Sequence, residues 1–193
     1  MVAVHSQMLP LGTQAPDFSL PDAVTGELVT RDSLLGGAGL LVMFICNHCP
    51  YVVHIMDAVG DVGAEALKAG VRVIAINAND VVKYPQDGPT AMKNLADRKG
   101  WAFPFALDAD QSVAKAYTAA CTPDFFLFDG TGALFYRGQL DSARPRNDLP
   151  VTGEDLRGAV VALAAGAAPP VDQVPSIGCN IKWTPGNEPD YFG

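Results

Sequence analysis

Hydrophobic and polar positions along the chain follow two different periods. Residues 39–45, GLLVMFI, and 71–77, VRVIAIN, are almost continuously apolar, which is typical of strands buried on both faces of a sheet. Between them, residues 50–69 carry apolar side chains at near-helical spacing, with Pro50 in the first turn and Gly70 as a stop signal. The pattern therefore predicts a strand, a helix and a second strand in succession.

Shorter segments extend this unit on both sides. Residues 15–20 and 26–30 predict an N-terminal β-hairpin, and residues 124–138 predict a second hairpin around a glycine-containing turn. Further helices are expected over residues 87–100, 110–119 and 152–166. Asp110 is the expected N-cap of the second of these helices. The alternation of strands and helices indicates an α/β fold with a central mixed sheet flanked by helices.

The last part of the chain has a different composition. After Pro169 it is rich in proline and glycine and has no clear period, which predicts an irregular C-terminal tail. We expect one domain over residues 1–166, including the N-terminal hairpin, and a tail over residues 167–193 that packs on the same domain.

The net charge of the chain limits which classes of molecule it is expected to bind. The 193 residues carry a formal net charge of −8, which argues against nucleic acid and anionic membranes as partners. No apolar run approaches the roughly 20 residues of a membrane helix. The first residues lack a basic stretch followed by an apolar one, so we expect no signal peptide and a cytoplasmic location.

The candidate chemistry lies at the junction between the first apolar strand and the helix. Cys46 and Cys49 stand there with His48 between them, and they could form a structural disulfide, two metal ligands or a redox pair. A helix N-terminus favours the thiolate of a nearby cysteine. We expect Cys46 to be the more accessible cysteine and the nucleophile, with its pKa lowered. Cys49 would resolve a mixed disulfide, and His48 would support the Cys46 thiolate.

Two motifs together resemble the thioredoxin superfamily. FICNHCPY, which begins at Phe44, is similar to the active-site motif of this superfamily. CTPDFFLFD, which begins at Cys121, is similar to the second characteristic motif of the superfamily. The resemblance implies a thioredoxin-like fold in which Thr122 precedes a cis-proline, Pro123, that faces the dithiol. Backbone groups of Thr122 would then hold a partner strand.

The N-terminal hairpin and the segments SIGCNIKW and GNEPDY resemble small bacterial proteins of the alkyl hydroperoxide reductase and thiol-specific antioxidant (AhpC/TSA) branch. The resemblance implies a thiol–disulfide oxidoreductase without an organic cofactor. Its partners would be protein or small-molecule thiols and disulfides, and a reductase or thiol electron donor.

Two departures from the family pattern keep alternatives open. Neither Cys46 nor Cys49 follows the P-x-x-x-T-x-x-C loop of peroxiredoxins, and Leu40 stands where many thioredoxins bury an acid. One alternative is a thiol-dependent peroxidase in which Cys46 forms a sulfenic acid. The other is a copper or zinc carrier that uses Cys46, Cys49 and either His48 or His54.

The remaining cysteines, Cys121 and Cys179, form a possible second thiol pair. Cys179 lies in the tail, and nearby apolar residues such as Trp183 could pack it against the domain. We expect the tail to bring Cys179 close to Cys121, as a disulfide or a redox relay. The alternative is that both are unrelated free thiols.

Overall fold

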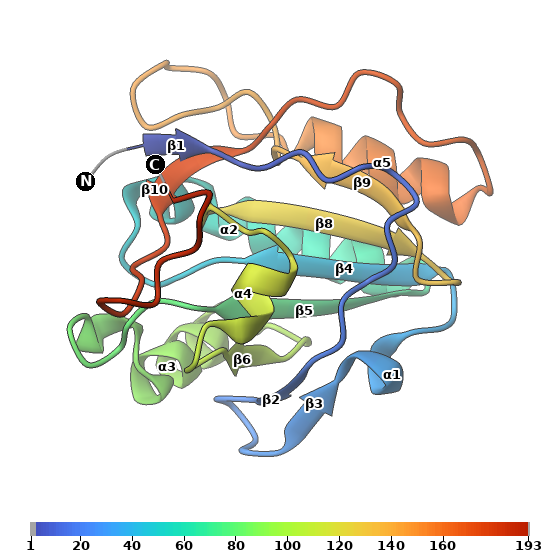
Figure 1. Ribbon diagram of the computed structural model, residues 1–193. Coiled ribbons are helices and arrows are strands. Elements are labelled where there is room, and N and C mark those ends of the chain that lie inside the picture. The colour runs from blue at the N-terminus through green and yellow to red at the C-terminus, as the bar shows by residue number, and fades with distance from the viewer. Residues whose placement is uncertain (1–2, 193) are drawn as a thin grey trace.

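The computed structural model describes residues 3–192, and a five-stranded mixed sheet forms its centre (Figure 1). The strand order is β6-β5-β4-β8-β9, with β4, β5 and β6 parallel to each other and β8 and β9 antiparallel to their neighbours. The strands span Gly39–Phe44 (β4), Val71–Asn77 (β5), Phe105–Leu107 (β6), Asp124–Asp129 (β8) and Leu134–Gly138 (β9). The central strand, β4, is buried along its whole length, as its apolar sequence predicts.

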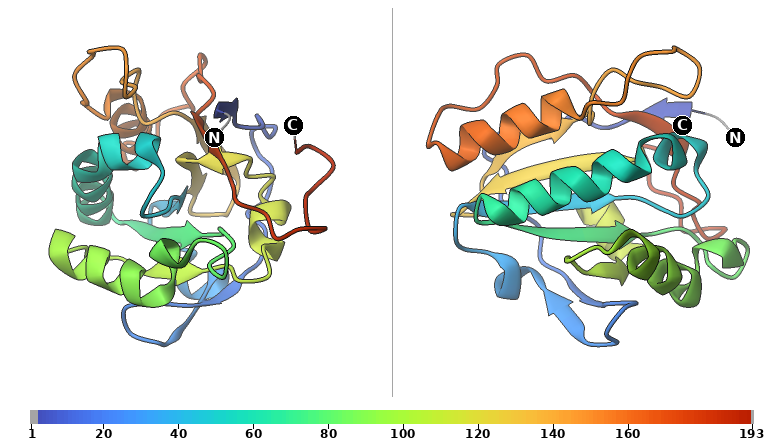
Figure 2. Two further views of the ribbon diagram at one scale, coloured as in Figure 1. Left: turned by 90° about the vertical axis from the view of Figure 1, so that its left-hand side faces the viewer. Right: turned by 180° about the vertical axis from the view of Figure 1, so that it is seen from behind.

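Three helices cover one face of this sheet, and α4 lies on the other face (Figure 2). The helices on the first face are α2 (Pro50–Lys68), α3 (Pro89–Lys99) and α5 (Glu154–Ala164). The opposite face is covered by α4 (Ser112–Ala116), by the segment around Phe18 and by the tail residues Ile181 and Trp183. Two short elements lie in the connections, namely α1 (Arg31–Leu34) and the 3₁₀ turn η1 (Pro85–Asp87).

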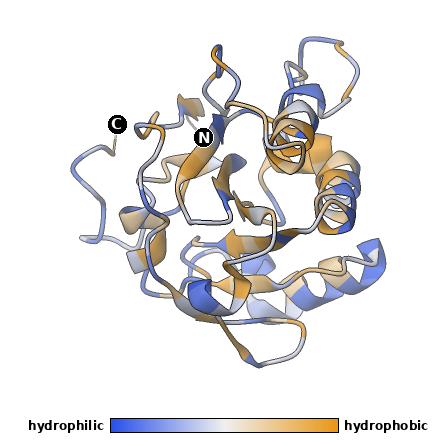
Figure 3. Ribbon diagram, turned by 90° about the vertical axis from the view of Figure 1, so that its right-hand side faces the viewer, coloured by the Kyte–Doolittle hydropathy of each residue, from blue (hydrophilic) through white to orange (hydrophobic). Residues whose placement is uncertain are grey.

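Apolar side chains alternate between the two faces of the central strand. Leu41 and Met43 pack toward α2, whereas Leu40, Val42 and Phe44 join the cluster on the other side. Hydrophobic residues, orange in Figure 3, gather in the strands and on the helix faces that meet them. The sheet is therefore the middle layer of three, with a hydrophobic core on each side.

The N-terminal hairpin is confirmed. Strands β2 (Ser19–Pro21) and β3 (Leu28–Thr30) pair antiparallel, and Asp22 closes the turn between them by accepting the backbone N–H groups of Val24 and Thr25. Among the described residues, no helix combines the length and the apolar composition needed to cross a bilayer.

The tail differs from the irregular segment that was expected. Ile177–Asn180 forms strand β10, which pairs antiparallel with β1 (Ala3–His5) on one side and β7 (Cys121–Thr122) on the other. A strand near each end of the described chain thus joins one small sheet at one side of the molecule (Figure 1). Since these partners are far away in sequence, the local composition of the tail does not reveal the strand.

The helix expected over residues 110–119 is shorter than predicted. It spans Ser112–Ala116, and its N-cap is Gln111 in the left-handed conformation, not Asp110. Asp108 accepts the backbone N–H groups of Val113 and Ala114 and satisfies the first turn from outside the helix.

Candidate active site

Cys46 and Cys49 lie where strand β4 meets helix α2, as the sequence predicts. Cys46 follows the end of β4, and Cys49 is the N-cap residue of α2, directly before Pro50. Both side chains are only 1% exposed, so accessibility does not distinguish them. The expectation that Cys46 is the more accessible cysteine is therefore wrong in this conformation, in which the two thiols are free and unbonded.

The peptide bond between Thr122 and Pro123 is cis, as expected, and Thr122 faces the dithiol. The Cys46 Sγ atom lies 3.5 Å from the Thr122 hydroxyl oxygen. The Cys49 Sγ atom lies 3.1 Å from the Thr122 carbonyl oxygen. One residue thus contacts both sulfurs, and it comes from a segment more than 70 residues away in the chain.

The pKa of Cys46 is raised, which is opposite to the direction expected from the sequence. A hydrogen bond with Cys49, burial and the nearby carboxylate of Asp87 raise the pKa of Cys46. The pKa of Cys49 is lowered to about 4, first by the hydrogen bond from Cys46 and then by Cys179 and the backbone N–H groups of Val52 and Cys179. The backbone N–H of Val52, in the first turn of α2, is thus a smaller contribution to the lowered pKa of Cys49.

His48 is held by a buried acid that the sequence reasoning missed. The His48 Nδ1 atom lies 2.5 Å from Asp87 Oδ2, and the imidazole ring stacks on Tyr84 with a centroid distance of 5.4 Å. Asp87 has no exposed surface, and its other carboxylate oxygen accepts the backbone N–H of Asn47. The acid that is absent at Leu40 is thus replaced by one beside Cys46, from a different part of the chain.

Two asparagines fix the position of Asp87. Asn79 donates from Nδ2 to Asp87 Oδ2 at 2.8 Å, and Asn77 donates from Nδ2 to the Asp87 carbonyl at 2.7 Å. In the sequence, Asp87 resembles an ordinary helix-start residue before Gly88 and Pro89. Burial of these three polar residues, which need partners inside the protein, is visible only in the structure.

A possible metal site overlaps this pair but differs from the predicted one. One ligand atom each of Cys46, His48 and Asp87 lies within 4.8 Å of the others. Among the described residues, this group includes neither Cys49 nor His54, and His54 is exposed on α2. Two of the three side chains already bond each other, so a metal would have to replace that hydrogen bond.

Cys179 meets a different cysteine from the one expected. In the pairing of β10 with β7, Cys179 lies opposite Thr122 and Cys121 lies opposite Asn180. Side chains that are adjacent along a strand leave opposite faces, so Cys121 and Cys179 point away from each other. The Cys121 thiol donates to the Pro123 carbonyl at 3.5 Å, whereas the Cys179 thiol is hydrogen-bonded to Cys49. All four cysteines are free.

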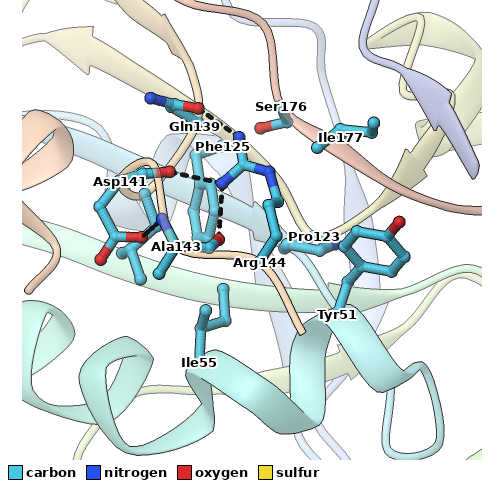
Figure 4. Close-up of a pocket in the computed structure, with 11 residues that line it drawn as sticks. Tyr51, Ile55, Pro123, Phe125, Gln139, Asp141, Ala143, Arg144, Ser176 and Ile177 are labelled. Atoms are coloured by element: carbon cyan, nitrogen blue, oxygen red, sulfur yellow. Dashed lines mark hydrogen bonds between the residues drawn. The ribbon is translucent and has the colours of Figure 1, made fainter. Parts of the chain in front are cut away.

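A narrow pocket lies beside the cis-proline (Figure 4). Tyr51 and Ile55 of α2, Pro123, and Ile177 at the start of β10 are among the residues that line it. Arg144 extends into it and donates to the carbonyls of Asp141 and Ala143 at 2.6 and 2.7 Å. The pocket gives the surroundings of the dithiol a partly apolar wall.

Comparison with known proteins identifies the family. The AhpC/TSA family model matches residues 11–137, which include the dithiol and the cis-proline. The chain belongs to the AhpC/TSA family. The thiol-disulfide oxidoreductase ResA of Bacillus thuringiensis is 25% identical over 128 residues, which are 66% of this chain and 69% of ResA. This family assignment and the similarity to ResA together identify the chain as a thioredoxin-like oxidoreductase.

Solved structures confirm the thioredoxin-like fold. An uncharacterized conserved protein from Geobacillus kaustophilus is 48% identical, with a TM-score of 0.94 over 96% of this chain and 98% of that protein. The thioredoxin domain of a thiol-disulfide oxidoreductase from Bacteroides vulgatus has a TM-score of 0.62 over 81% of this chain and 99% of its own, at 17% identity. The first of these similarities extends well beyond the part that matches the family model.

Proposed function

We propose that the protein catalyses thiol–disulfide exchange by cycling Cys46 and Cys49 between dithiol and disulfide. The observation that supports this best is the pair of hydrogen-bonded thiols at the N-terminus of α2, in contact with Thr122 before the cis-proline. The pKa of Cys49 is lowered while that of Cys46 is raised, and a thiolate within the pair is what an exchange reaction requires.

The chemical steps follow from these pKa shifts. As a substrate disulfide arrives, the proton moves from Cys46 to Cys49, and the Cys46 thiolate attacks one substrate sulfur. The substrate disulfide breaks, and its second sulfur leaves as a thiolate. Cys49 then loses its proton to this leaving group and attacks Cys46. The Cys46–Cys49 disulfide forms, and the substrate sulfur that was bound to Cys46 leaves as a thiolate, which takes a proton from solvent.

Cys46 takes the outer role because of what surrounds each sulfur. Cys46 is followed by Asn47 and His48, which are partly exposed. Cys49 is enclosed by Thr122, by Cys179 and by Cys46 itself. The Thr122 hydroxyl favours the Cys46 thiolate during attack, since its hydrogen bond lowers the pKa of Cys46. His48 is held in place by Asp87 and positions a polar ring at the edge of the pair.

The partner is a thiol or disulfide of a protein or a small molecule. A reductase or a thiol electron donor completes the cycle. An arriving peptide does not find the backbone of Thr122 free, because β10 already pairs there. It must therefore displace β10 or approach along the pocket beside Pro123. A cytoplasmic location stays a prediction, which cell fractionation tests.

Reduction of insulin disulfides with a dithiol donor tests the proposal. Cys46→Ser should abolish turnover, and Cys49→Ser should stall as a mixed disulfide on Cys46 that mass spectrometry detects. Cys121→Ser is the matched control, because this buried thiol contacts neither sulfur by hydrogen bond and its loss should leave turnover intact. Full turnover in Cys46→Ser would overturn the assignment.

The cluster of Cys46, His48 and Asp87 favours one second candidate, a carrier of a divalent metal. Stoichiometric zinc or copper after purification from cells, lost in Asp87→Asn, would support the carrier. Metal-free protein with exchange activity would support the oxidoreductase. Rapid peroxide consumption would instead indicate the thiol peroxidase, although neither cysteine has the peroxiredoxin loop.

A further inference from the structure

Strand β10 occupies the place where the thioredoxin resemblance leads us to expect a partner strand. It pairs antiparallel with Cys121–Thr122, directly before the cis-proline, and its Cys179 lies opposite Thr122. A side chain on Gly178 would come within 2.1 Å of the Thr122 carbonyl oxygen, so only glycine permits this approach. The chain thus presents its own cysteine at the edge where a partner's cysteine was expected.

Contacts on both sides hold Cys179 in this position. Strand β1 pairs with β10 on its outer edge, with Ala3 opposite Cys179. Before the strand, Ser176 donates to the Gly138 carbonyl at 2.6 Å; after it, the backbone N–H of Lys182 donates to Asn79 at 2.8 Å. Cys179 is only 3% exposed and belongs to the same core cluster as Cys46 and Cys49. Its position is set by the fold rather than by a mobile tail.

Cys49 is the cysteine that lies next to both Cys46 and Cys179. Its Sγ atom lies 3.1 Å from the Thr122 carbonyl oxygen, against which Gly178 packs, and Cys179 lies opposite Thr122 in the small sheet and in the same core cluster as Cys46 and Cys49. In thiol–disulfide exchange the attacked sulfur lies between the attacking and the leaving sulfur. Cys49 therefore stands in the central position for an exchange between its two neighbours.

We propose that Cys179 is a third redox thiol, which accepts Cys49 from the Cys46–Cys49 disulfide and forms a second disulfide, Cys49–Cys179. The Cys179 thiolate attacks Cys49 Sγ, the bond between Cys49 and Cys46 breaks, and Cys46 leaves as a thiolate. The proton that Cys179 gives up ends on Cys46. No electrons enter or leave, so the step needs no further oxidant. This inference rests on the proposed Cys46–Cys49 cycle.

Formation of the first disulfide removes one of the causes that keep Cys179 protonated, although burial, the largest cause, remains. Burial and the neighbouring Cys49 raise the pKa of Cys179 to about 12, so in the reduced protein it is a protonated thiol. Once Cys49 is in a disulfide, its negative charge is gone and this contribution disappears, while Lys182 still favours the thiolate. Strand β10 lies outside the stretch that matches the AhpC/TSA family model.

Disulfide mapping of singly oxidised protein tests this inference. The full chain is oxidised with one equivalent of diamide, quenched in acid, unfolded, labelled with N-ethylmaleimide and digested. We expect both Cys46–Cys49 and Cys49–Cys179 peptides in the unchanged chain, with label on Cys46 in the second species. Cys179→Ser should reduce label on Cys46 in singly oxidised protein at least tenfold. Cys121→Ser, the matched control, should leave the map unchanged.

A second variant separates this inference from the proposed function. Cys46→Ser removes exchange activity but keeps Cys49 and Cys179, so diamide should still join these two, and Cys46→Ser/Cys179→Ala should not form this bond. Insulin reduction without any Cys49–Cys179 peptide, in unchanged and Cys46→Ser protein with native circular dichroism, would overturn the inference and leave the proposed function standing. A Cys49–Cys179 peptide in protein that does not reduce insulin would overturn the proposed function while showing that Cys49 and Cys179 can form a disulfide.

Discussion

At the scale of single residues, the pKa of Cys49 is lowered and that of Cys46 is raised. Cys46 donates the hydrogen bond, and the carboxylate of Asp87 opposes a second negative charge next to it. A resting thiolate on the inner cysteine keeps the outer one protonated until a substrate arrives. This arrangement protects Cys46 from oxidation, because the thiolate is the reactive form.

Titration of the reduced protein checks this charge assignment. The ultraviolet absorbance of one thiolate should persist through neutral pH and disappear as the pH falls through about 4. In Cys46→Ala the midpoint should rise by at least one pH unit, because the strongest contribution to the low pKa of Cys49 is the hydrogen bond from Cys46. Cys121→Ser is the control and should keep the midpoint. A thiolate that survives in Cys49→Ser with the same midpoint would move the charge to Cys46.

Sequence reasoning found some of these residues and not others, for physical reasons. The local sequence identifies Cys46, Cys49 and Pro50, because a predicted strand, two cysteines and a predicted helix start follow one another directly. Asp87 reaches the site only because the connection after β5 folds back, and the buried Asn77 and Asn79 hold it there. Tertiary contacts of this kind leave no periodic trace.

At the scale of elements, strand β10 couples the tail to the site. Its hydrogen bonding runs to β1 and β7, and it covers the edge of Thr122. The strands and helices of the central layers were predictable, because their apolar periods are local. A four-residue strand bounded by proline-rich sequence was not, because its two partners lie elsewhere in the chain.

Substitution of Gly178 tests whether β10 closes the site. Gly178→Ala places a methyl group in collision with the Thr122 carbonyl, so β10 must move outward. We expect a loss of about 1–3 kcal/mol in the free energy of unfolding and faster alkylation of Cys49 in the folded protein. Gly158→Ala is the control, because nothing lies within 4 Å of its added carbon in helix α5. Equal alkylation rates in the two variants would show that β10 does not limit access.

At the scale of the whole molecule, a buried carboxyl outside the site makes stability depend on pH. Asp108 is fully buried where β6 ends, and it accepts the first N–H groups of α4. Burial raises the pKa of Asp108 from 3.8 to about 6. The folded state therefore binds this proton more tightly than the unfolded state does, and ionisation of Asp108 opposes folding.

The expected contribution of Asp108 is a loss of stability as the pH rises from about 4 to 7, measured as the difference between the unchanged chain and Asp108→Asn, because the lowered pKa of Cys49 acts in the opposite direction over the same range. Below the unfolded pKa both states are protonated and nothing is lost, while above about 6 the loss from Asp108 is complete. It should reach about 3 kcal/mol, since one pKa unit corresponds to about 1.4 kcal/mol. Urea unfolding at several pH values measures it, and Asp108→Asn should remove it. Asp172→Asn, at an exposed position in the tail, is the control; if it flattened the curve equally, Asp108 would not be the source.

The small sheet that contains β1 and β10 has a consequence for the order of synthesis. The ribosome produces β1, β4, α2 and β7 before β10, so everything that β10 pairs with is already made when it appears. Until then Cys49 lacks its neighbour Cys179, and the edge of Thr122 is uncovered. The nascent chain thus passes through a stage with an open dithiol, and the pairing of Ala3 with Cys179 can form only after β10 has been made.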